Sequence, residues 1–423
     1  RIQDLSQESY VEMATSAPPL PPLQPLPQPR LEQLLPGVSL LLPLSRRGTG
    51  PGLILLVPDL GSSILSIEHG IPSPVIKWAE ESYVVAAIDA SAFENSEQGE
   101  RILLDITHAL NENPCCDTKS RIGLIAYSSH MWSLVAPILP NIPTIKAAVM
   151  YGSIANAINH NGVFIPIVQH LAGKALPNTL QRGKDLMQYG YPETDCANFS
   201  IPFQPDFHYN AEAISHTRNL TFLKENIGGP FFDLEQIWDE HTYYEFENRS
   251  VEHTMSTMVQ EPYVNHVPTV TGGIGRKELS EFYRDHFIWK NPKNTTLELI
   301  SRTIGIDRIV DEFIFKFTHD TEVDWLLTEF PVLRPHIATW KFHSWQWSIF
   351  GGDRLYHEHI SWDQGTVLMQ LGLMPTYLPA SNEPTTEKAR NGYKTPALGK
   401  ETAAKLREKN SVPSNAMLAN LLS

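Results

Sequence analysis

Cysteine is scarce in this sequence, with three among 423 residues. Cys115 and Cys116 are adjacent and Cys196 stands alone, so neither their number nor their spacing fits a disulfide framework or a cysteine-based zinc site. An odd number of isolated thiols is typical of proteins in a reducing compartment. We therefore predict reduced, structural cysteines and a cytoplasmic location.

Long apolar runs and excess positive charge are missing as well. The most apolar stretches, Val38–Leu44 and Gly52–Val57, fall far short of the roughly 20 residues that span a bilayer, so no membrane helix is expected. The 33 Lys and Arg residues face 47 Asp and Glu, which leaves a net charge of −14. This balance argues against nucleic acid and anionic membranes as partners, since both need a basic surface.

Apolar residues make up 42% of the chain, which is enough for large cores, and the length predicts two domains. The proline-dense run APPLPPLQPLPQP at Ala17–Pro29 marks residues 1–36 as an N-terminal arm with polyproline II character. We expect this arm to pack along another surface or to act as a linker. Recognition by an SH3-type domain is the alternative.

From Gly52 onward, short apolar segments alternate with helical ones. The expected strands are LILLVP, YVVAAIDA, RIGLIAYS and IKAAVMYG, and the helical segments include IPSPVIKWAEES and RILLDITHAL. Strands that are apolar throughout and alternate with helices predict a parallel sheet covered on both faces. Residues 37–229 are therefore expected to form an α/β domain.

The order of elements in residues 37–229 resembles the dienelactone hydrolase family of α/β-hydrolases. The family's nucleophile lies on a sharp turn that needs small residues on both sides. The corresponding turn here reads AYSSH, so Ser128 takes the nucleophile position and His130 replaces the second small residue. The stretches that carry the resemblance are Leu53–Leu60, Tyr83–Asp89, Gly123–Ser129 and Ala147–Gly152.

The resemblance also implies a catalytic base and an acid, and neither stands at its expected place. The base should lie in Tyr191–Phe199, where Cys196 is found, and the acid should follow the segment IPIVQHLAG, where Gly and Lys stand. We therefore interpret this domain as a hydrolase scaffold that has lost its chemistry. The alternative is an ester or lactone hydrolase in which Ser128 uses His130 or His170 as its base.

The second half differs in composition, because residues 231–378 hold 7 of the 9 Trp and 9 of the 16 His. Two helical stretches, FFDLEQIWDEHTYYEF and SVEHTMSTMVQ, and a turn, VTGGIG, precede strands of period two. These strands are TLELISRTIGI, RIVDEFIFKFTH, HIATWKFHSWQWSIF and RLYHEHISWD. This order predicts an α+β domain in which a curved sheet wraps over helices. A tail, residues 379–423, follows with a helix from about Gly399.

Residues 230–378 resemble the nuclear transport factor 2-like superfamily, in particular its SnoaL-type, polyketide-cyclase-like branch. The matching positions are Tyr263–Pro268, Gly272–Gly273, Thr318–His319 and Leu355–Asp363. The resemblance implies a cone-shaped, cystatin-like α+β fold. It also implies an acidic residue near the end of the last strand that transfers protons.

Strand alternation sorts the side chains of the last strand into two faces. One face holds Leu355, His357, His359, Ser361 and Asp363, and the other holds Tyr356, Glu358, Ile360 and Trp362. We assign the first face to the interior. On the strand 306–319 the same rule aligns Asp311, Phe313, Phe315, Phe317 and His319 as an aromatic wall with polar ends, which suits a small apolar ligand.

We expect Asp363 to act as the acid/base, His359 or His319 to polarise a substrate carbonyl, and His266 to orient the substrate, with His357 beside them. Substrate contacts are expected from His241, Tyr244, Phe313, Phe315, Phe317 and Trp362. Three alternatives stay open: Asp363 caps the helix DQGTVLMQLG, the His241 and Tyr244 pair belongs to a domain contact, or the two strand histidines and Asp363 bind a metal. The favoured interpretation has no metal and no cofactor.

These patterns predict a proton-transfer enzyme that cyclises, isomerises or dehydrates a small hydrophobic carbonyl compound in secondary metabolism. Such reactions need a base next to the carbonyl and an acid at its oxygen, which carboxylates and histidines supply. A non-catalytic binding or assembly module is the further alternative. A stripe of Trp340, Trp345 and Trp347 predicts a homodimer, because an exposed aromatic surface needs cover.

Overall fold

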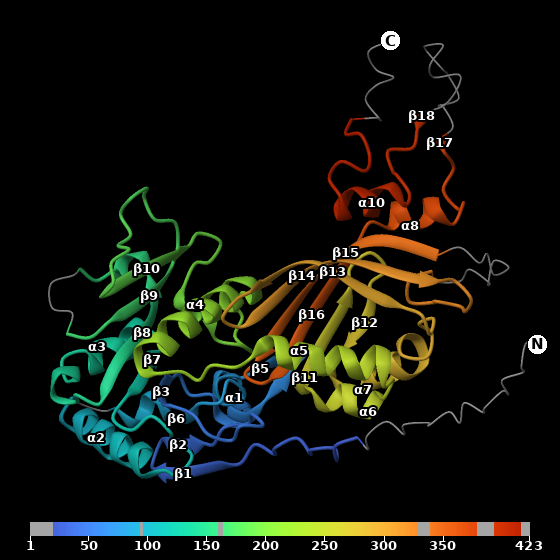
Figure 1. The fold of residues 1–423 in the computed structure, drawn as a ribbon. Coiled ribbons are helices and arrows are strands. Elements are labelled where there is room, and N and C mark those ends of the chain that lie inside the picture. Colours follow the sequence, from blue (N-terminus) through green and yellow to red (C-terminus); the bar gives the residue numbers. More distant parts are fainter. Residues whose placement is uncertain (1–19, 94–95, 160–163, 328–338, 379–392, 416–423) are drawn as a thin grey trace, which may run out of the picture.

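The computed structural model describes residues 20–93, 96–159, 164–327, 339–378 and 393–415. These residues form two sheet-based domains that lie next to each other along the molecule (Figure 1). Within the described ranges, no helix is both long enough and apolar enough to cross a bilayer.

The first domain is built on an eight-stranded sheet with the order β1-β2-β6-β3-β7-β8-β9-β10. The strands from β6 to β10 are parallel, and an antiparallel hairpin of β1 and β2 extends one edge. The sheet therefore begins at Leu31, before the predicted domain boundary at residue 37. The strands are β1 (Leu31–Leu35), β2 (Val38–Leu41), β3 (Gly52–Val57), β6 (Val84–Asp89), β7 (Ile122–Ala126), β8 (Ile145–Ser153), β9 (Ile167–Ala172) and β10 (Leu186–Tyr191), with a small hairpin of β4 (Ile67–Glu68) and β5 (Ile71–Pro72) outside.

Helices cover both faces of this sheet, as the apolar strands predicted. Leu53 and Leu55 of β3 pack in the core beneath α1 (Pro74–Glu80) and α4 (Tyr209–Ile227). Ile54 and Leu56 point the other way, into the core beneath α2 (Ser96–Glu112) and α3 (Ser129–Val135). Successive residues of a strand meet opposite layers, which is why each strand is apolar throughout.

The second domain is built on a six-stranded sheet with the order β12-β11-β16-β15-β14-β13. Neighbouring strands are antiparallel except β11 and β16, which are parallel. The four predicted strands of this half are confirmed as β13 to β16. The strands are β11 (Met258–His266), β12 (Thr271–Ile274), β13 (Thr296–Ile304), β14 (Arg308–Thr318), β15 (Thr339–Gly351) and β16 (Arg354–Trp362).

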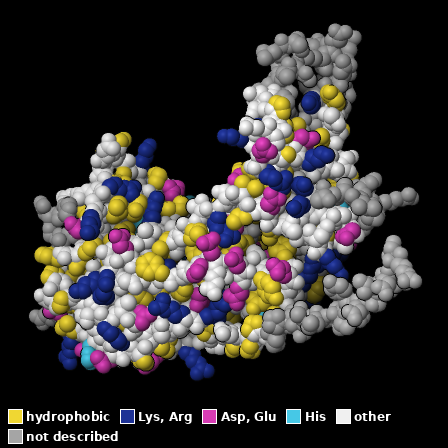
Figure 2. All heavy atoms as spheres, viewed as in Figure 1, with side chains coloured by type: hydrophobic (Ala, Val, Ile, Leu, Met, Phe, Trp, Pro, Cys, Tyr) yellow, Lys and Arg dark blue, Asp and Glu magenta, His cyan; other side chains and the backbone are white. Residues whose placement is uncertain are grey.

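Three helices cover the inner face of this sheet: α5 (Leu234–Thr242), α6 (Val251–Ser256) and α7 (Gly275–Phe282). Helix α5 is amphipathic, with Ile237 and Trp238 in the core and Glu235 and Asp239 exposed. Figure 2 shows acidic side chains gathered over this part of the surface. A π-helical turn follows α5 at Tyr243–Glu247, and another follows α7 at Tyr283–Phe287.

Two local predictions for this half are wrong. The second predicted helix ends at Ser256, and the following residues Met258–Gln260 belong to β11. The predicted turn VTGGIG contains strand β12, which pairs with β11 and leads into α7. In both places pairing with a neighbouring strand overrides the local sequence preference.

The predicted tryptophan stripe is also corrected. Trp340 is 3% exposed and packs in the core with Phe342, whereas Trp345 and Trp347 are 45% and 36% exposed on the other face of β15. The reason is strand alternation, since an even-numbered residue of β15 points away from its odd-numbered neighbours. Two of the three predicted tryptophans, Trp345 and Trp347, are therefore exposed on the surface.

The C-terminal elements are α8 (Gln364–Gln370), β17 (Tyr377–Leu378), β18 (Tyr393–Lys394) and α10 (Glu401–Arg407). Helix α10 lies close to the predicted start at Gly399. It is fastened to the second domain by the guanidinium of Arg407, which donates to both carboxylate oxygens of Glu298 at 2.6 Å.

The two domains are joined at a polar seam and by the proline-rich arm. The carboxylate of Asp353 in the second domain accepts hydrogen bonds from the backbone N–H groups of Arg46 and Arg47 in the first, both at 2.9 Å. The described part of the arm runs along the second domain before it enters β1 (Figure 1), and its Pro27 carbonyl accepts from Gln260 Nε2 at 2.7 Å. The arm thus packs on its own chain.

Candidate active site

An aromatic cavity lies between the inner face of the second sheet and the helices that cover it. Its free volume is about 30 Å³, so the lining rings nearly fill it and a ligand larger than a few atoms must displace part of the lining. The rings around it contact one another, as in the pairs Phe315–Phe342 and Phe287–Trp325, whose centroids are both 5.3 Å apart. The free space is therefore a narrow slot that suits a small, flat ligand. The aromatic lining consists of Phe246, Phe287, Phe313, Phe315, Trp325, Phe342 and Trp362.

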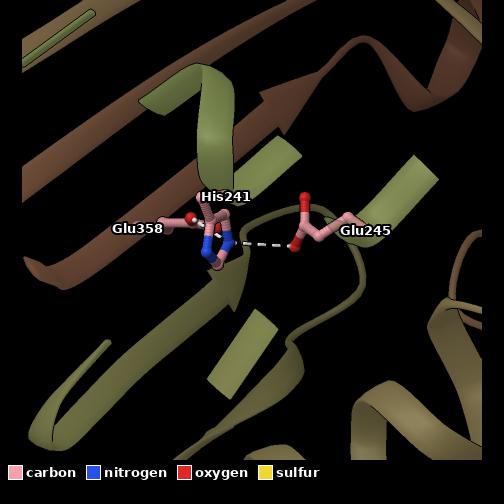
Figure 3. A group of neighbouring side chains, drawn as sticks. All are labelled: His241, Glu245 and Glu358. Atoms are coloured by element: carbon pink, nitrogen blue, oxygen red, sulfur yellow. Dashed lines mark hydrogen bonds and ion pairs between the residues drawn. The ribbon is translucent and has the colours of Figure 1, made fainter. Parts of the chain in front are cut away.

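Two buried carboxylates form the polar end of this cavity. Glu245 and Glu358 both line it, and both approach the same nitrogen, Nε2 of His241, at 3.2 and 3.3 Å. Figure 3 shows the imidazole of His241 between the two acids. Helix α5 supplies the histidine, the first π-helical turn supplies Glu245, and β16 supplies Glu358. All three side chains are buried.

The hydrogen bonds of Thr257 fix the proton on the far side of His241. The Thr257 hydroxyl donates to the Thr254 carbonyl at 2.7 Å, so it accepts from His241 Nδ1, which lies 2.6 Å away. Nδ1 therefore carries a hydrogen, and Nε2 faces the two acids. A lone pair there would face two anions, so a proton on Nε2 or on one acid is required at neutral pH.

Burial and the neighbouring charges set where that proton resides. Burial disfavours an imidazolium, but Glu245 and Glu358 outweigh it and raise the pKa of His241 to about 10. Burial raises the pKa of the Glu358 carboxyl, against the opposing effect of His241. The cluster thus holds an imidazolium together with a carboxyl group that gains a proton more readily than an ordinary glutamate.

Two further polar groups line the same cavity. Burial, followed by the nearby acids, raises the pKa of Tyr283 well above its ordinary value, so its hydroxyl keeps its proton, and no hydrogen bond of good geometry engages it within the described residues. Burial lowers the pKa of His266 to about 4, so this ring is neutral, with Nδ1 donating to the Thr271 carbonyl at 3.3 Å. Tyr283 is therefore a protonated donor that lies beside Glu245 inside the cavity.

The π-helical turns bring the polar groups into place. The N–H of Asn248 donates to the Tyr243 carbonyl and that of Ile288 to the Tyr283 carbonyl, each five residues back and each at 2.9 Å. The first turn directs Glu245 and Phe246 into the cavity, and the second does the same for Tyr283 and Phe287. Insertions of this kind inside α-helices occur frequently at functional sites.

An open groove adjoins the cavity and shares Phe246 and Leu297 with it. The groove contains the exposed rings of Tyr243 and Trp289 and the cation Arg249. Phe246 and Leu297 therefore stand between the surface of the molecule and the carboxylate pair.

The predicted proton-transfer residue Asp363 lies outside this site. It is exposed and caps α8, where its carboxylate accepts from the Gly365 N–H at 3.0 Å and from the Thr366 hydroxyl at 2.6 Å. Trp362 points into the cavity instead. The alternation on β16 was right, but the interior face is the one with Glu358, Ile360 and Trp362, so the assignment of the faces was wrong.

Other predicted residues divide between the cavity and its surroundings. His266, Phe313, Phe315 and Trp362 line it. His241 stands behind the two carboxylates, and Phe317 and His319 are packed in the core beside Trp340. The remaining three do not line the cavity: Tyr244 stacks on His253, and His357 and His359 lie on the opposite face of β16.

Sequence reasoning missed Glu245, Glu358 and Tyr283. Glu358 was assigned to the outer face with Ile360 and Trp362, although two bulky apolar neighbours at spacing two are a signal for the buried face. Glu245 and Tyr283 lie in π-helical turns, whose extra residue shifts them out of the 3.6-residue pattern. No periodicity rule would have placed them together.

Among the described residues of the first domain, none forms a catalytic arrangement with Ser128. It has extended backbone, with φ −151° and ψ 155°, and caps α3 by accepting from the Met131 N–H at 3.2 Å. A nucleophile elbow requires a strained turn at this place. His170 is buried and bonds to Tyr191 and Asn219, and no described histidine contacts the Ser128 hydroxyl.

The described residues contain one group with the donor atoms for a metal ion. The ligand atoms of His241, Glu245 and Glu358 lie within 4.8 Å of one another. One imidazole nitrogen and two carboxylate oxygens suit a divalent cation. His357, His359 and Asp363 form no such group.

No protein-family model and no curated protein matches the chain. Solved structures match about a third of it. A proposed polyketide cyclase from Acidithiobacillus ferrooxidans is 16% identical, with 33% of this chain and 93% of that one covered and a TM-score of 0.28. An NTF2-like protein from Burkholderia thailandensis is 13% identical (33% and 96% covered, TM-score 0.25), and a SnoaL-like polyketide cyclase from Agrobacterium tumefaciens is 12% identical (34% and 100% covered, TM-score 0.26). Values this low carry no information on activity or substrate.

Proposed function

We propose that the second domain catalyses cofactor-independent proton transfer on a small, flat, hydrophobic carbonyl compound, with cyclisation, isomerisation or dehydration as the outcome. The observation that carries the proposal is the pair of carboxylates, Glu245 and Glu358, that share His241 at the polar end of an aromatic cavity. Two neighbouring carboxyl groups next to an apolar slot can act as base and acid in one reaction.

The roles follow from position and protonation. Glu245 removes a proton from the carbon next to the substrate carbonyl. Glu358, whose raised pKa favours the protonated form, donates to the oxygen as negative charge develops there, assisted by the hydroxyl of Tyr283. His241 does not line the cavity and is a positioning residue that balances the charge of the pair.

A route for the substrate is part of the proposal. A ligand enters from the open groove and displaces Phe246 and Leu297, which the groove and the cavity share. Once inside, it lies between aromatic rings that exclude water and strengthen every electrostatic contact.

We propose no hydrolytic role for the first domain, although its strand order supports an α/β-hydrolase-like fold. The extended backbone of Ser128 and the absence of a base among its described contacts support this. A fluorophosphonate probe should leave Ser128 unlabelled, and Ser128→Ala should hydrolyse p-nitrophenyl esters no differently from wild type. A loss of a hundredfold or more in the variant would restore the hydrolase interpretation.

Hydrogen exchange tests the proposed function. Small aromatic and cyclic ketones are incubated with the protein in D₂O and EDTA, and proton NMR follows deuterium entering the position next to the carbonyl. Exchange above the buffer rate, unchanged by EDTA, supports proton transfer without a metal. Binding without exchange across the panel would reduce the cavity to a binding site, and exchange that EDTA abolishes would overturn the cofactor-independent mechanism.

A further inference from the structure

A second enclosed cavity lies between the two domains, away from the carboxylate pair. Its free volume is about 40 Å³, which has room for a group of a few atoms. Helices α1 and α4 of the first domain supply one side, and β14, β15 and β16 of the second supply the other. Hydrogen bonds cross this boundary, as between the Thr217 hydroxyl of α4 and the Asp307 carboxylate at 2.6 Å. The cavity exists only where both domains are joined.

Most charges around this cavity are already paired. Lys77 lies 2.7 Å from both carboxylate oxygens of Glu212, and the Arg308 guanidinium donates to the Asp307 carboxylate at 2.8 Å. Glu81 accepts from His216 at 3.2 Å and lies 3.9 Å from the ammonium of Lys224. These pairs leave one lining carboxyl group, that of Glu80, without a cation within 4 Å among the described residues.

Glu80 and His357 have hydrogen-bonding capacity that the protein leaves unused. Glu80 is 6% exposed, and one backbone N–H, that of Gln260, reaches its carboxylate at a distance of 3.3 Å. His357 is 4% exposed; its Nδ1 lies 3.1 Å from the Tyr209 hydroxyl, and its Nε2 has no partner in the described structure. Buried polar atoms without partners are costly and rare in folded proteins.

We propose that this interdomain cavity binds a small organic cation, a primary ammonium compound, with Glu80 and His357 as the groups that receive its N–H bonds. Glu81, Glu212 and Asp307 are each paired with a cation, and Glu80 is the one described lining carboxyl group without such a partner, so an anion would find no unpaired lining cation while a cation would find Glu80. Tyr209, Tyr356 and Phe350 line the same space and offer aromatic faces to an ammonium group.

The protonation of both acceptors agrees with this ligand. In the tautomer whose Nδ1 hydrogen points to the Tyr209 hydroxyl, Nε2 of His357 is left as an acceptor. Burial raises the pKa of Glu80 to about 7. A bound cation would return Glu80 to its ionised form, so binding is expected to strengthen as the pH rises from 6 to 8.

The site is distinct from the proposed reaction centre, although one strand carries residues of both. His357 faces the interdomain cavity, and the next residue of β16, Glu358, lines the aromatic cavity on the other side of the sheet. Ligand binding in the interdomain cavity can therefore be measured independently of catalysis in the aromatic cavity.

Isothermal titration of the full chain with butylamine at pH 8 tests the proposal, with butanol and butyrate as neutral and anionic probes of the same length. We expect butylamine to bind and to raise the melting temperature, and the other two to bind at least tenfold more weakly. His357→Phe and Glu80→Gln should each weaken butylamine tenfold or more. His359→Phe is the matched control, because this residue lies two positions along β16 outside the cavity, and it should stay within twofold.

Equal binding of butanol and butylamine, or none of either, would show a hydrated cavity only and overturn the proposal. Tighter binding of butyrate would overturn the assigned charge. The melting temperature without ligand identifies a variant that fails to fold. If either His357→Phe or Glu80→Gln fails to fold, the other variant, on the opposite side of the cavity, still tests the proposal. Loss of butylamine binding in His359→Phe but not in His357→Phe would also contradict the assignment.

Discussion

At the scale of single residues, the chemistry depends on two buried histidines whose neighbours drive their pKa values in opposite directions. His241 has two carboxylates within 3.3 Å and is held as an imidazolium, whereas His266 lies among aromatic rings and is held neutral. The difference arises from neighbours and not from depth, because both rings are buried. The number of histidines in the sequence therefore does not predict their charge, because the charge of each ring depends on the groups that it contacts.

The neutral state of His266 predicts a dependence of stability on pH. The pKa of His266 is about 4 in the folded protein and 6.5 in the unfolded chain, so the unfolded state takes up the proton first as the pH falls. The contribution of neutral His266 to the free energy of unfolding is complete above pH 6.5. This contribution decreases by about 3 kcal/mol as the pH falls towards 4. His266→Phe, which keeps a ring in place, should reduce the loss of unfolding free energy over this range by that amount.

Urea unfolding at pH 6.5 and pH 4.5 compares the two proteins over an interval that covers about 2 kcal/mol of this effect. Other buried histidines, such as His170, contribute equally to each and cancel in the comparison. An identical loss of stability in wild type and variant would show that His266 is charged in the fold.

At the scale of elements, the sequence predicts strands well and helix ends less well. The four strands β13 to β16 follow from their period-two pattern, and the alternation on β16 separates Asp363 from Trp362 correctly. Alternation cannot tell which of the two faces is buried. The polar residues His357, His359 and Asp363 favoured assigning their own face to the interior, and that assignment was wrong. The π-helical turns left no local signal, since one extra residue in a helix is a tertiary property.

Asp363 offers a test at this scale, because its role is to begin a helix. Asp363→Ala removes the acceptor for the Gly365 N–H and the Thr366 hydroxyl, so it should cost about 1 kcal/mol of stability with no loss of turnover. Asp363→Asn is the matched control, since asparagine caps helices as well as aspartate. Urea denaturation that finds the two variants equally destabilised would argue against a capping role.

At the scale of the whole molecule, two domains are fixed to each other by contacts that the sequence could not specify. Asp353 binds the backbone of Arg46 and Arg47, and the proline-rich arm lies along the second domain through Pro27. Composition identified two halves and an arm, but a contact between residues some 300 positions apart leaves no trace in one sequence. The interdomain cavity depends on such contacts, which explains why no sequence pattern pointed to it.

The outer face of the second sheet predicts a homodimer. Trp345 and Trp347 are both at least a third exposed on β15, and a second copy of this chain would cover them. Light scattering should find a particle of about 95 kDa, twice 47.6 kDa, and the double variant Trp345→Ser with Trp347→Ser should shift it towards the monomer. A 47.6 kDa particle for wild type at micromolar concentration would contradict the prediction.

The central claim is that Glu245 and Glu358, not Asp363, carry out the proton transfer. The most direct test is the rate at which a ketone that exchanges with wild type gains deuterium in the presence of Glu245→Gln, with Asp363→Asn measured beside it. The isosteric amide keeps the shape of the cavity but cannot accept the proton, so we predict a fall of about a hundredfold or more with little change in ketone binding. Full exchange by Glu245→Gln, or an equal fall in Asp363→Asn, would contradict the account.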